Sequence, residues 1–408
     1  MTTADKNLQH LMDCIMIDTM GLRVPNVPNA KLPRAFSQIG DGDDIATNTG
    51  WAKGSLKSES SKKGQSLRVS TVKSKSQLLV EGSNAIHYQG HNIVSSGDAV
   101  MTAYSMLDAV RQTYPLQLKD KMRPWEFMRG EGIEVTRIDI PFMLKTPAGV
   151  SVGAVVNALA LAGIRSGLVT TLFPRETVYF DQHSQLQSLK AYDKAAEMTQ
   201  AKHKFEFPPS ENAASLQLLT KDAVRLEAVY RLKSLTRRFE GKVPLPSMLS
   251  PKVLARMLME LLEKYNLRGT LRSCLGRAEL QKIRPVYRTT VALWQRGEEM
   301  TSFFGNDEGL FKRHRRIIKA EYGIDILLPH PGAIDVPMEL GDVLRTENFV
   351  PVPAEIRADQ SLFYARDMQA EWRNYCRQHR ITSVSSIYLN PYNLDDDLPA
   401  ANADKLDS

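Results

Sequence analysis

Two apolar runs that each carry an arginine and an acid two residues apart constrain the fold of this chain more than any other feature. The runs are Val135–Ile140, with Arg137 and Asp139, and Ala223–Val229, with Arg225 and Glu227. Alternation of apolar and polar residues predicts two half-buried β-strands. Side chains two positions apart on a strand lie on the same face of the sheet, so each arginine is expected beside its acid.

Charged side chains in the middle of a strand are costly to bury unless they are paired or bind a metal. One interpretation is an Arg–carboxylate pair satisfied within each strand. The other is that Asp139 and Glu227 together hold a hard divalent cation, because carboxylate oxygens favour Mg²⁺ or Mn²⁺ over zinc. The residues alone leave both interpretations open.

A tyrosine and a lysine two residues apart lie between these two strands, in the segment Ser188–Glu197. This segment predicts Tyr192 at the start of a helix, with Lys194 as the nearest cation. A tyrosine has a reference pKa of about 10, so it attacks only when a cation, a base or a metal assists. The alternative is an ordinary packing tyrosine, and Tyr179 in the strand-like run Thr177–Phe180 is a rival nucleophile.

Histidines at positions 87 and 91 lie in the run Ile86–Asn92. On a helix, this spacing would place two metal ligands on one face, although Gly90 weakens the helix prediction. Glu81, on the strand expected before this run, is a further candidate acid ligand. A structural or surface role is the alternative for each histidine.

Seven short motifs follow one another along the chain: Met16–Pro25, Gln89–Asn92, Arg137–Asp139, Ala191–Lys194, Arg225–Glu227, Phe311–Arg316 and Tyr322–Asp325. This ordered series resembles the gene II replication initiators of filamentous bacteriophages. Related trans-acting plasmid rolling-circle initiators carry a similar series. The resemblance runs roughly from Met16 to Asn348.

The resemblance implies a rolling-circle initiator that nicks one strand of the phage origin by transesterification. Tyr192, which aligns better than Tyr179, would form a 5′-phosphotyrosyl link and leave a free 3′-OH primer, and the same site would later rejoin the displaced strand. Lys194 would stabilise the phenolate or the leaving group. Mg²⁺ or Mn²⁺ would bind Asp139 and Glu227, with Glu81 and His91 as further ligands, and His91 is favoured over His87.

The fold implied by the resemblance is related to the HUH endonucleases, but no His-apolar-His triplet occurs in this chain. The histidine ligands of those enzymes must therefore be absent or replaced, which leaves the metal and its ligand count open. No Gly-x-x-x-x-Gly-Lys-Ser/Thr loop occurs either, so unwinding would require a host helicase. Origin DNA and a host polymerase are the other expected partners, and an oligomer on DNA is left open.

The order of predicted elements indicates an α+β fold, with helices covering one face of a largely antiparallel sheet. Strands are expected at Leu67–Val72, Gln77–Gly82 and Leu168–Phe173, and helices at Asp98–Tyr114 and Val150–Gly163. These elements belong to a nicking domain over residues 1–240. Within it, residues 26–66 are rich in Ser, Gly, Asn, Asp and Lys and are expected to be loops or a mobile insertion.

A basic, mainly helical DNA-binding region is expected over residues 241–350. Residues 225–320 contain 21 Lys and Arg against 9 Asp and Glu, a balance of +12, whereas residues 321–408 contain 7 against 15, a balance of −8. A helix-turn-helix is predicted near 286–325, and its basic helix is expected to contact DNA. The candidate contacts are Arg137, Arg225, Lys312, Arg313, His314, Arg315 and Arg316. Residues 351–408 are expected to form an extension ending in an acidic, disordered tail.

Composition excludes some other classes of protein. The three cysteines lack metal-type spacing, no run approaches a membrane span, and the polar start does not resemble a signal peptide. A reducing compartment, the host bacterial cytoplasm, is therefore expected, without membrane partners. Two functions compete with nicking: a DNA-binding regulator without enzymatic activity, and a metal-dependent nuclease that hydrolyses DNA with water.

Overall fold

The structure is a computed structural model that describes most of the chain. The described residues are 3–25, 51–57, 65–72, 77–113, 132–173, 177–199, 210–267, 270–271, 277–322, 324–327 and 338–378. The predicted acidic, disordered tail, from Leu394 to Ser408, lies outside these residues.

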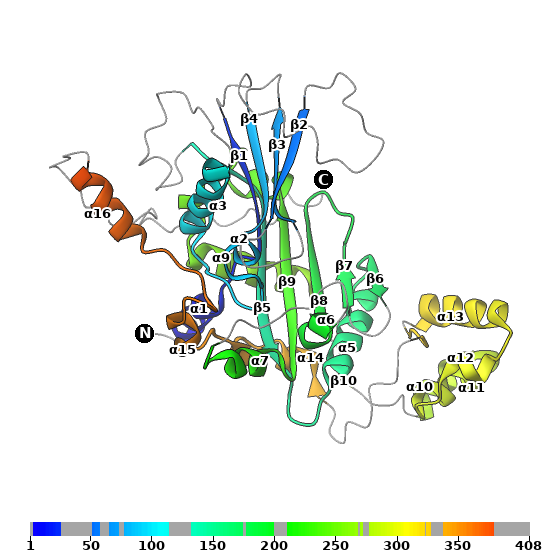
Figure 1. Cartoon of the computed structure of the whole chain (residues 1–408). Helices are drawn as coiled ribbons and strands as arrows, with labels where there is room; N and C mark the ends of the chain where they lie inside the picture. Colours follow the sequence, from blue (N-terminus) through cyan, green and yellow to red (C-terminus); the bar gives the residue numbers. More distant parts are fainter. Residues whose placement is uncertain are drawn as a thin grey trace.

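A ten-stranded sheet forms the centre of the molecule, and every strand pair in it is antiparallel (Figure 1). The order is β2-β3-β4-β1-β5-β9-β8-β7-β6, and β12 pairs with β5. The strands are β1 (Thr19–Val24), β2 (Trp51–Lys57), β3 (Gln65–Val72), β4 (Gln77–Ser83), β5 (Glu134–Lys145), β6 (Thr170–Phe173), β7 (Thr177–Phe180), β8 (Gln187–Asp193), β9 (Ala223–Arg231) and β12 (Phe349–Val350). The predicted antiparallel sheet is confirmed.

The ladder between β5 and β9 separates an apolar face of the sheet from a polar one. Ile140 pairs with Ala228, and both side chains are buried in the main hydrophobic core. One position further along, Glu227 faces the other way, together with Arg225 and Asp139. Each arginine therefore shares a face with the acid of its own strand, as the sequence predicts.

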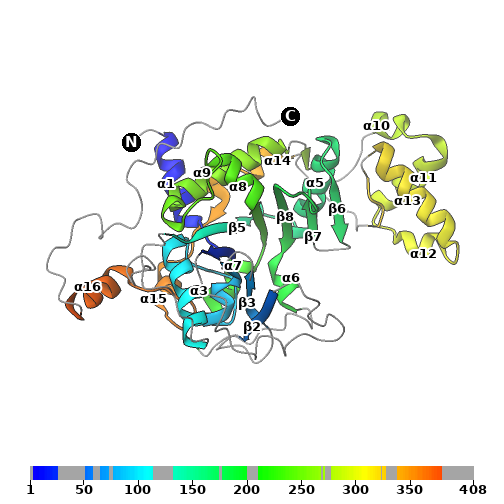
Figure 2. The same cartoon turned by 90° about the horizontal axis from the view of Figure 1, so that it is seen from above.

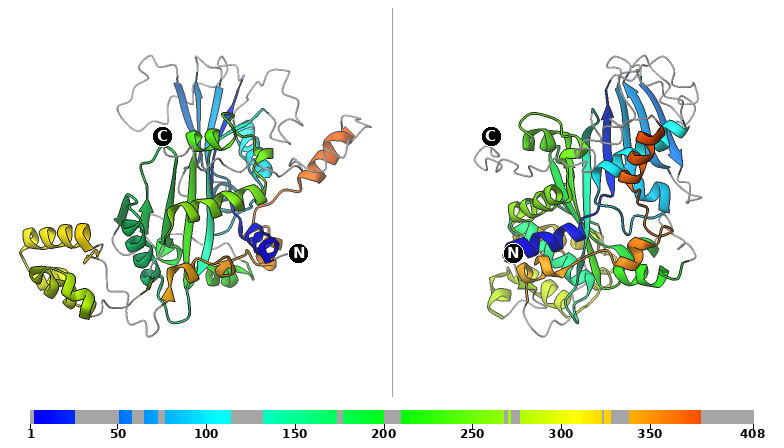
Figure 3. Two further views of the ribbon diagram at one scale, coloured as in Figure 1. Left: turned by 180° about the vertical axis from the view of Figure 1, so that it is seen from behind. Right: turned by 90° about the vertical axis from the view of Figure 1, so that its left-hand side faces the viewer.

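Helices cover the apolar face of the sheet. They are α1 (Thr3–Cys14), α3 (Ala99–Thr113), α5 (Val152–Arg165), α8 (Leu232–Arg238) and α9 (Pro251–Tyr265). All five contribute buried side chains to one core with the strands, or contact it directly. Seen from behind, α9 crosses the sheet (Figure 3). The predictions for α3 and α5 are confirmed, whereas α1 was not predicted, because its apolar residues are few.

Helix α9 begins at a serine cap followed by a proline. The Ser250 side chain accepts a hydrogen bond from the backbone N–H of Val253, and Pro251 occupies the first helical turn. The Tyr230 hydroxyl of β9 donates to the Met257 carbonyl in the middle of this helix. Although α9 belongs to the predicted region 241–350, it packs on the sheet.

Further helices lie at one end of the polar face, so the prediction of helices on a single face is incomplete. These are α2 (Asn84–Gln89), α6 (Lys194–Thr199), α7 (Ala213–Thr220) and α15 (Ala354–Ala358). Leu216 of α7 and Ile356 of α15 are buried in a second apolar cluster with Met143 of β5.

Strand β2 corrects the prediction that residues 26–66 consist only of loops. It pairs along its whole length with β3, from Trp51 opposite Val72 to Lys57 opposite Gln65. Its composition is poor in the β-branched residues that identify strands, so the backbone hydrogen bonds of the neighbouring strand decide its conformation. Residues 65 and 66 of the predicted insertion begin β3, and residues 26–50 and 58–64 lie outside the described residues.

A separate group of helices has its own apolar core, which includes Tyr287, Trp294 and Ile318. The group consists of α10 (Arg277–Lys282), α11 (Pro285–Gln295), α12 (Met300–Phe304) and α13 (Glu308–Tyr322). It lies beside the β6 edge of the main body (Figures 1 and 2). A short helix, a turn and a basic helix are present at α12 and α13, where the sequence predicts them.

The chain returns to the main body after these helices. Strand β10 (Thr270–Leu271) pairs with β11 (Met338–Glu339), and α14 (Leu340–Val343) and β12 follow. The helical group is therefore an insertion between two segments of the main body. Helix α16 (Met368–Gln378) is the last described element. Among the described helices, none has both the length and the apolar character needed to cross a membrane.

Close packing of α5 on the sheet generates the first testable prediction. A Cβ added at Gly163 would lie 3.0 Å from Thr170 Oγ1 and closer still to the Phe180 ring. We expect Gly163→Ala to lower the free energy of unfolding by about 1–3 kcal/mol, measured by urea denaturation. Gly153→Ala in the same helix is the control, since no heavy atom lies within 4 Å of its added Cβ. Equal stability of the two variants would contradict this account.

Candidate functional site

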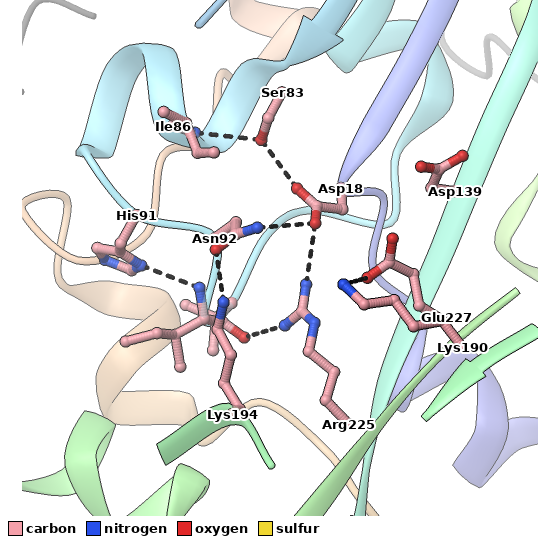
Figure 4. Close-up of polar contacts among 12 residues, drawn as sticks. Asp18, Ser83, Ile86, His91, Asn92, Asp139, Lys190, Lys194, Arg225 and Glu227 are labelled. Carbon is pink, nitrogen blue, oxygen red and sulfur yellow. Dashed lines mark hydrogen bonds and ion pairs between the residues drawn. The ribbon is translucent and has the colours of Figure 1, made fainter. Parts of the chain in front are cut away.

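Charged side chains gather on the polar face, where β5, β8 and β9 lie beside the start of β1 (Figure 4). The group consists of Asp18, Asn92, Asp139, Lys190, Tyr192, Lys194, Arg225 and Glu227. Five of them come from β5, β8 and β9, because residues on adjacent strands are brought opposite one another by the register.

Tyr192 lies near the end of β8, and the helix begins only at Lys194, which corrects the prediction of a helical tyrosine. Its hydroxyl donates a 3.4 Å hydrogen bond to Glu227 Oε2. The side chain is buried, with 2% of the residue exposed. Burial raises the pKa of Tyr192 well above its ordinary value, and the charge of Arg225 opposes this shift. The resting hydroxyl is therefore protonated.

Lys190, rather than Lys194, is the lysine nearest the Tyr192 ring. Lys190 Nζ lies 3.9 Å from the ring centroid and 4.0 Å from Glu227 Oε2. Lys194 Nζ lies 5.9 Å from the centroid and donates instead to Asn92 Oδ1 at 2.8 Å and Glu197 Oε2 at 2.6 Å. On a strand, residues two apart lie on the same face, which the helical interpretation of this segment missed.

Arg225 is completely buried and does not pair with the acid of its own strand. Its Nη2 lies 3.4 Å from Asp18 Oδ2, and its Nη1 donates to the Ile93 carbonyl at 3.0 Å. The interpretation that each arginine pairs with the acid of its own strand is therefore wrong for β9. The predicted contact with DNA is corrected as well, because no part of Arg225 lies on the surface.

Arg137 and Asp139 do form the pair within one strand. Arg137 donates to both carboxylate oxygens of Asp139, at 2.9 and 2.7 Å, and to Glu81 Oε1 at 3.1 Å. Burial raises the pKa of Asp139 above its usual range, and the bonds from Arg137 oppose that shift. One third of the Arg137 side chain is exposed, so it remains accessible to a ligand from solvent.

The candidate metal ligands come together only in part. Glu227 is opposite Pro141, two residues from Asp139, so the two carboxylates are diagonal neighbours on adjacent strands. Glu81 joins them through Arg137. Among the described residues, no three His, Cys, Asp or Glu side chains form a group that could hold a metal. Two carboxylates do suit Mg²⁺, which commonly keeps waters and takes its other ligands from a substrate phosphate.

His91 lies apart from these carboxylates, beyond Asn92 (Figure 4). Its Nδ1 accepts a hydrogen bond from the Ile93 backbone N–H at 3.3 Å. Burial and the charge of Lys194 lower the pKa of His91 to about 3, so the ring is neutral. The ring thus contacts the backbone of its own loop, and the structure does not bring it to Asp139 and Glu227.

Asp18 and Asn92 are site residues that the sequence analysis did not select. Asn92 Nδ2 donates to Asp18 Oδ2 at 2.8 Å, and Ser83 Oγ donates to Asp18 Oδ1 at 3.0 Å. Asp18 thereby contacts Arg225, Asn92 and Ser83 from three separate segments. Both residues lie in motifs of the family resemblance, and an acid in the apolar run around Asp18 was a further signal.

The basic helix α13 presents only some of its predicted contacts to solvent. Lys312, Arg313 and Arg316 are exposed. His314 is buried and hydrogen-bonds Thr290 at 3.0 Å, and Arg315 is tied to Asp325 through two hydrogen bonds of 2.7 and 3.0 Å. The predicted contact between His314 and DNA is therefore wrong. This residue lies on the inward face of the helix and packs in the core of the helical group.

Comparisons with known proteins identify the family to which the strands carrying these residues belong. The family model for the N-terminal part of the phage replication-associated protein, the gene II product, matches residues 16–244, which contain every site residue named on the sheet. The replication-associated gene II protein of Enterobacteria phage I2-2 is 26% identical over 252 residues, covering 61% of this chain and 69% of that protein.

A solved structure of a rolling circle replication initiator protein from Geobacillus stearothermophilus is also similar to this chain. The comparison covers 62% of this chain and 85% of that one, at 10% identity and a TM-score of 0.27. The family match spans more than half of the chain and includes the strands that carry the site. The chain belongs to the family of phage replication-associated proteins, the gene II replication initiators of filamentous phages.

Proposed function

We propose that this initiator nicks single-stranded origin DNA through Tyr192 and later rejoins the displaced strand. The observation that carries the proposal is the Tyr192 hydroxyl, which points at the Glu227 carboxylate while Lys190 lies over its ring. A buried phenol with an adjacent acceptor and adjacent cations can be activated as a nucleophile.

In the proposed step, Glu227 accepts the phenol proton and the phenolate oxygen attacks the scissile phosphorus. A bond forms between Tyr192 and the phosphorus, and the bond from the phosphorus to the 3′ oxygen breaks. The 3′ oxygen leaves with the bonding electrons and takes up a proton, giving the 3′-OH primer. Phosphodiester energy is retained in the 5′-phosphotyrosyl link, so attack by a 3′-OH reverses the reaction and joins the strand.

Cations around the tyrosine would stabilise the phenolate. Arg225 lies directly opposite Tyr192 on β9, and its charge is the leading influence that lowers the pKa of this tyrosine against the effect of burial. Lys190 contacts the ring itself. Lys194 is held by Asn92 and Glu197 one residue beyond the strand end, where it would approach the leaving group.

Asp139 and Glu227 would hold a divalent cation, Mg²⁺ or Mn²⁺. When bound, such a cation neutralises charge on the phosphate oxygens. Asp139 would first have to release Arg137, which now occupies both of its carboxylate oxygens. Arg137 would then be free to contact the same phosphate with its partly exposed guanidinium.

The helical group would locate the duplex origin through the exposed cations of α13, Lys312, Arg313 and Arg316. Glu81 remains proposed as an additional ligand, because Arg137 joins its carboxylate to that of Asp139. His91 is not, because its loop holds it away from these carboxylates. A host helicase and a host polymerase would supply unwinding and synthesis. These partners place the proposed reaction in the host bacterial cytoplasm.

Replacing the nucleophile is the direct test. Tyr192→Phe removes only the hydroxyl, so we expect it to abolish the covalent protein–DNA adduct formed with Mg²⁺ or Mn²⁺ on single-stranded origin fragments. The adduct is measured on a denaturing gel, and Tyr179→Phe is the matched control that should retain it. Cleavage without an adduct would indicate hydrolysis by water. Tight duplex binding with neither cleavage nor adduct would support the DNA-binding regulator.

Glu227→Gln tests the acceptor and the metal site together. We expect single-turnover adduct formation to fall by about 100-fold or more, because an amide neither accepts the phenol proton nor binds a cation as a carboxylate does. The rate is measured across a range of Mg²⁺ concentrations and pH. Glu263→Gln, an exposed change on α9, is the control. Wild-type rates for Glu227→Gln at every Mg²⁺ concentration would exclude both roles.

Neutralising α13 tests duplex recognition. Each phosphate contact contributes a slope of about −0.9 to the dependence of log binding constant on log salt, so Arg313→Ala with Arg316→Ala should reduce the slope by about 2. The measurement is a salt titration of duplex binding. Arg373→Ala with Arg377→Ala on α16 removes the same number of exposed charges as a control. An unchanged slope in the α13 variant would show that these arginines do not contact DNA.

A further inference from the structure

An irregular loop supports the site and depends on contacts from elsewhere in the chain. The loop joins α2 to α3 and contains His91, Asn92 and Ile93. Asn92 donates a hydrogen bond to Asp18 and accepts one from Lys194, each with a length of 2.8 Å. The backbone carbonyl of Ile93 accepts a hydrogen bond from Arg225. Because the loop has no ladder of its own, other segments must fix its backbone.

A segment from the far end of the sequence provides such contacts. It is Phe349–Arg366, called the strap below, and it lies outside the residues 16–244 that match the family model. Its backbone N–H at Tyr364 donates to Gln89 Oε1 at 2.7 Å. The amide nitrogen of Gln89 donates in turn to the carbonyls of Val94, at 2.7 Å, and His91, at 3.2 Å. One buried amide thus joins the strap to both ends of the loop.

Apolar side chains also connect the strap to the loop. Leu362 and Phe363 of the strap are buried in one cluster with Ile93 and Val94 of the loop. The backbone of Leu362 also lies near the His91 ring, where its influence raises the pKa of that ring against the effect of burial. The loop therefore lies between the strap and the polar network of the site, with contacts on both sides.

The strap is anchored at each end, so it can act as a fixed support. At its start, Phe349 pairs with Leu144 of β5 and its ring contacts Phe142 edge-on. At its end, the Tyr364 ring stacks on Tyr88 at 4.0 Å between centroids, and Arg366 pairs with Asp108 of α3 at 2.8 Å.

We propose that the strap is a positioning element of the nicking site, acting through Tyr364 and Gln89 on the loop that carries Asn92. The inference rests on the proposed function for its effect on nicking. Without the strap, the loop loses its backbone support, Asn92 no longer holds Lys194 and Asp18 in place, and the cations around Tyr192 are misplaced. DNA binding by the exposed cations of α13 does not depend on this contact.

Two substitutions test the two halves of this connection. Tyr364→Ala removes the ring stack that anchors the strap. Gln89→Glu retains the oxygen that accepts from Tyr364 but replaces the nitrogen that donates to His91 and Val94. Tyr364→Phe keeps both the stack and the backbone donor, losing only the 3.2 Å hydrogen bond from the hydroxyl to Ser105, and serves as the conservative variant. Arg377→Ala, an exposed change beyond the strap, is the control.

Adduct formation is measured under single-turnover conditions at increasing concentrations of a single-stranded origin oligonucleotide with Mg²⁺. We expect Tyr364→Ala and Gln89→Glu to lower the maximal rate by about tenfold or more, since a small misplacement of catalytic groups suffices for that loss. The half-saturating DNA concentration should stay within about twofold of the wild type. Tyr364→Phe should restore most of the rate.

Hydrogen exchange provides a second readout that does not depend on activity. Amides of residues 89–95 should exchange faster in Tyr364→Ala and Gln89→Glu, while those of β5 and β9 keep wild-type protection. Faster loop exchange with an unchanged nicking rate would overturn the positioning role, as would unchanged loop exchange or loss of protection throughout the sheet. If the wild type itself forms no adduct, the proposed function fails, and the exchange data alone decide whether the strap holds the loop.

Discussion

The burial of the Arg225 guanidinium in the middle of the sheet is the constraint on which the site depends. Removing such a charge from water costs several kcal/mol unless opposite charge and hydrogen-bond acceptors meet it. Asp18 and the carbonyl of Ile93 meet it from two separate segments. The same requirement therefore fixes the start of β1 and the loop after α2, which is why these segments converge on one point of the polar face.

Tyr192 is directly opposite this buried charge, and its chemistry follows from that position. Burial keeps the hydroxyl protonated, whereas the neighbouring cations favour the phenolate. The two influences oppose each other, and the effect of burial on the pKa is the larger one.

Local sequence patterns predicted those features of the fold that depend on local structure. Alternation in β5 and β9 placed Arg137 with Asp139 and Arg225 with Glu227 on shared faces, and helical spacing located α3 and α5. Pairing partners were not predictable in this way. Arg225 turns to Asp18 across more than 200 residues of sequence, and the Lys190 ammonium approaches Tyr192 only because the segment is a strand. Strand β2 owes its conformation to pairing with the next strand, β3, whereas the strap owes its position to segments distant in sequence.

The path of the chain joins the helical group to the site. The chain leaves the body at β10 and returns at β11, and these two strands pair, so the excursion begins and ends at one point. That point contacts α5, which packs on β6 to β9, and the returning chain continues through β12 into the strap. A helical group attached by a single linker could move independently of the sheet. Here both of its ends are built into elements of the main body that pack against the strands around Tyr192, so the proposed duplex recognition and strand cleavage would share one framework.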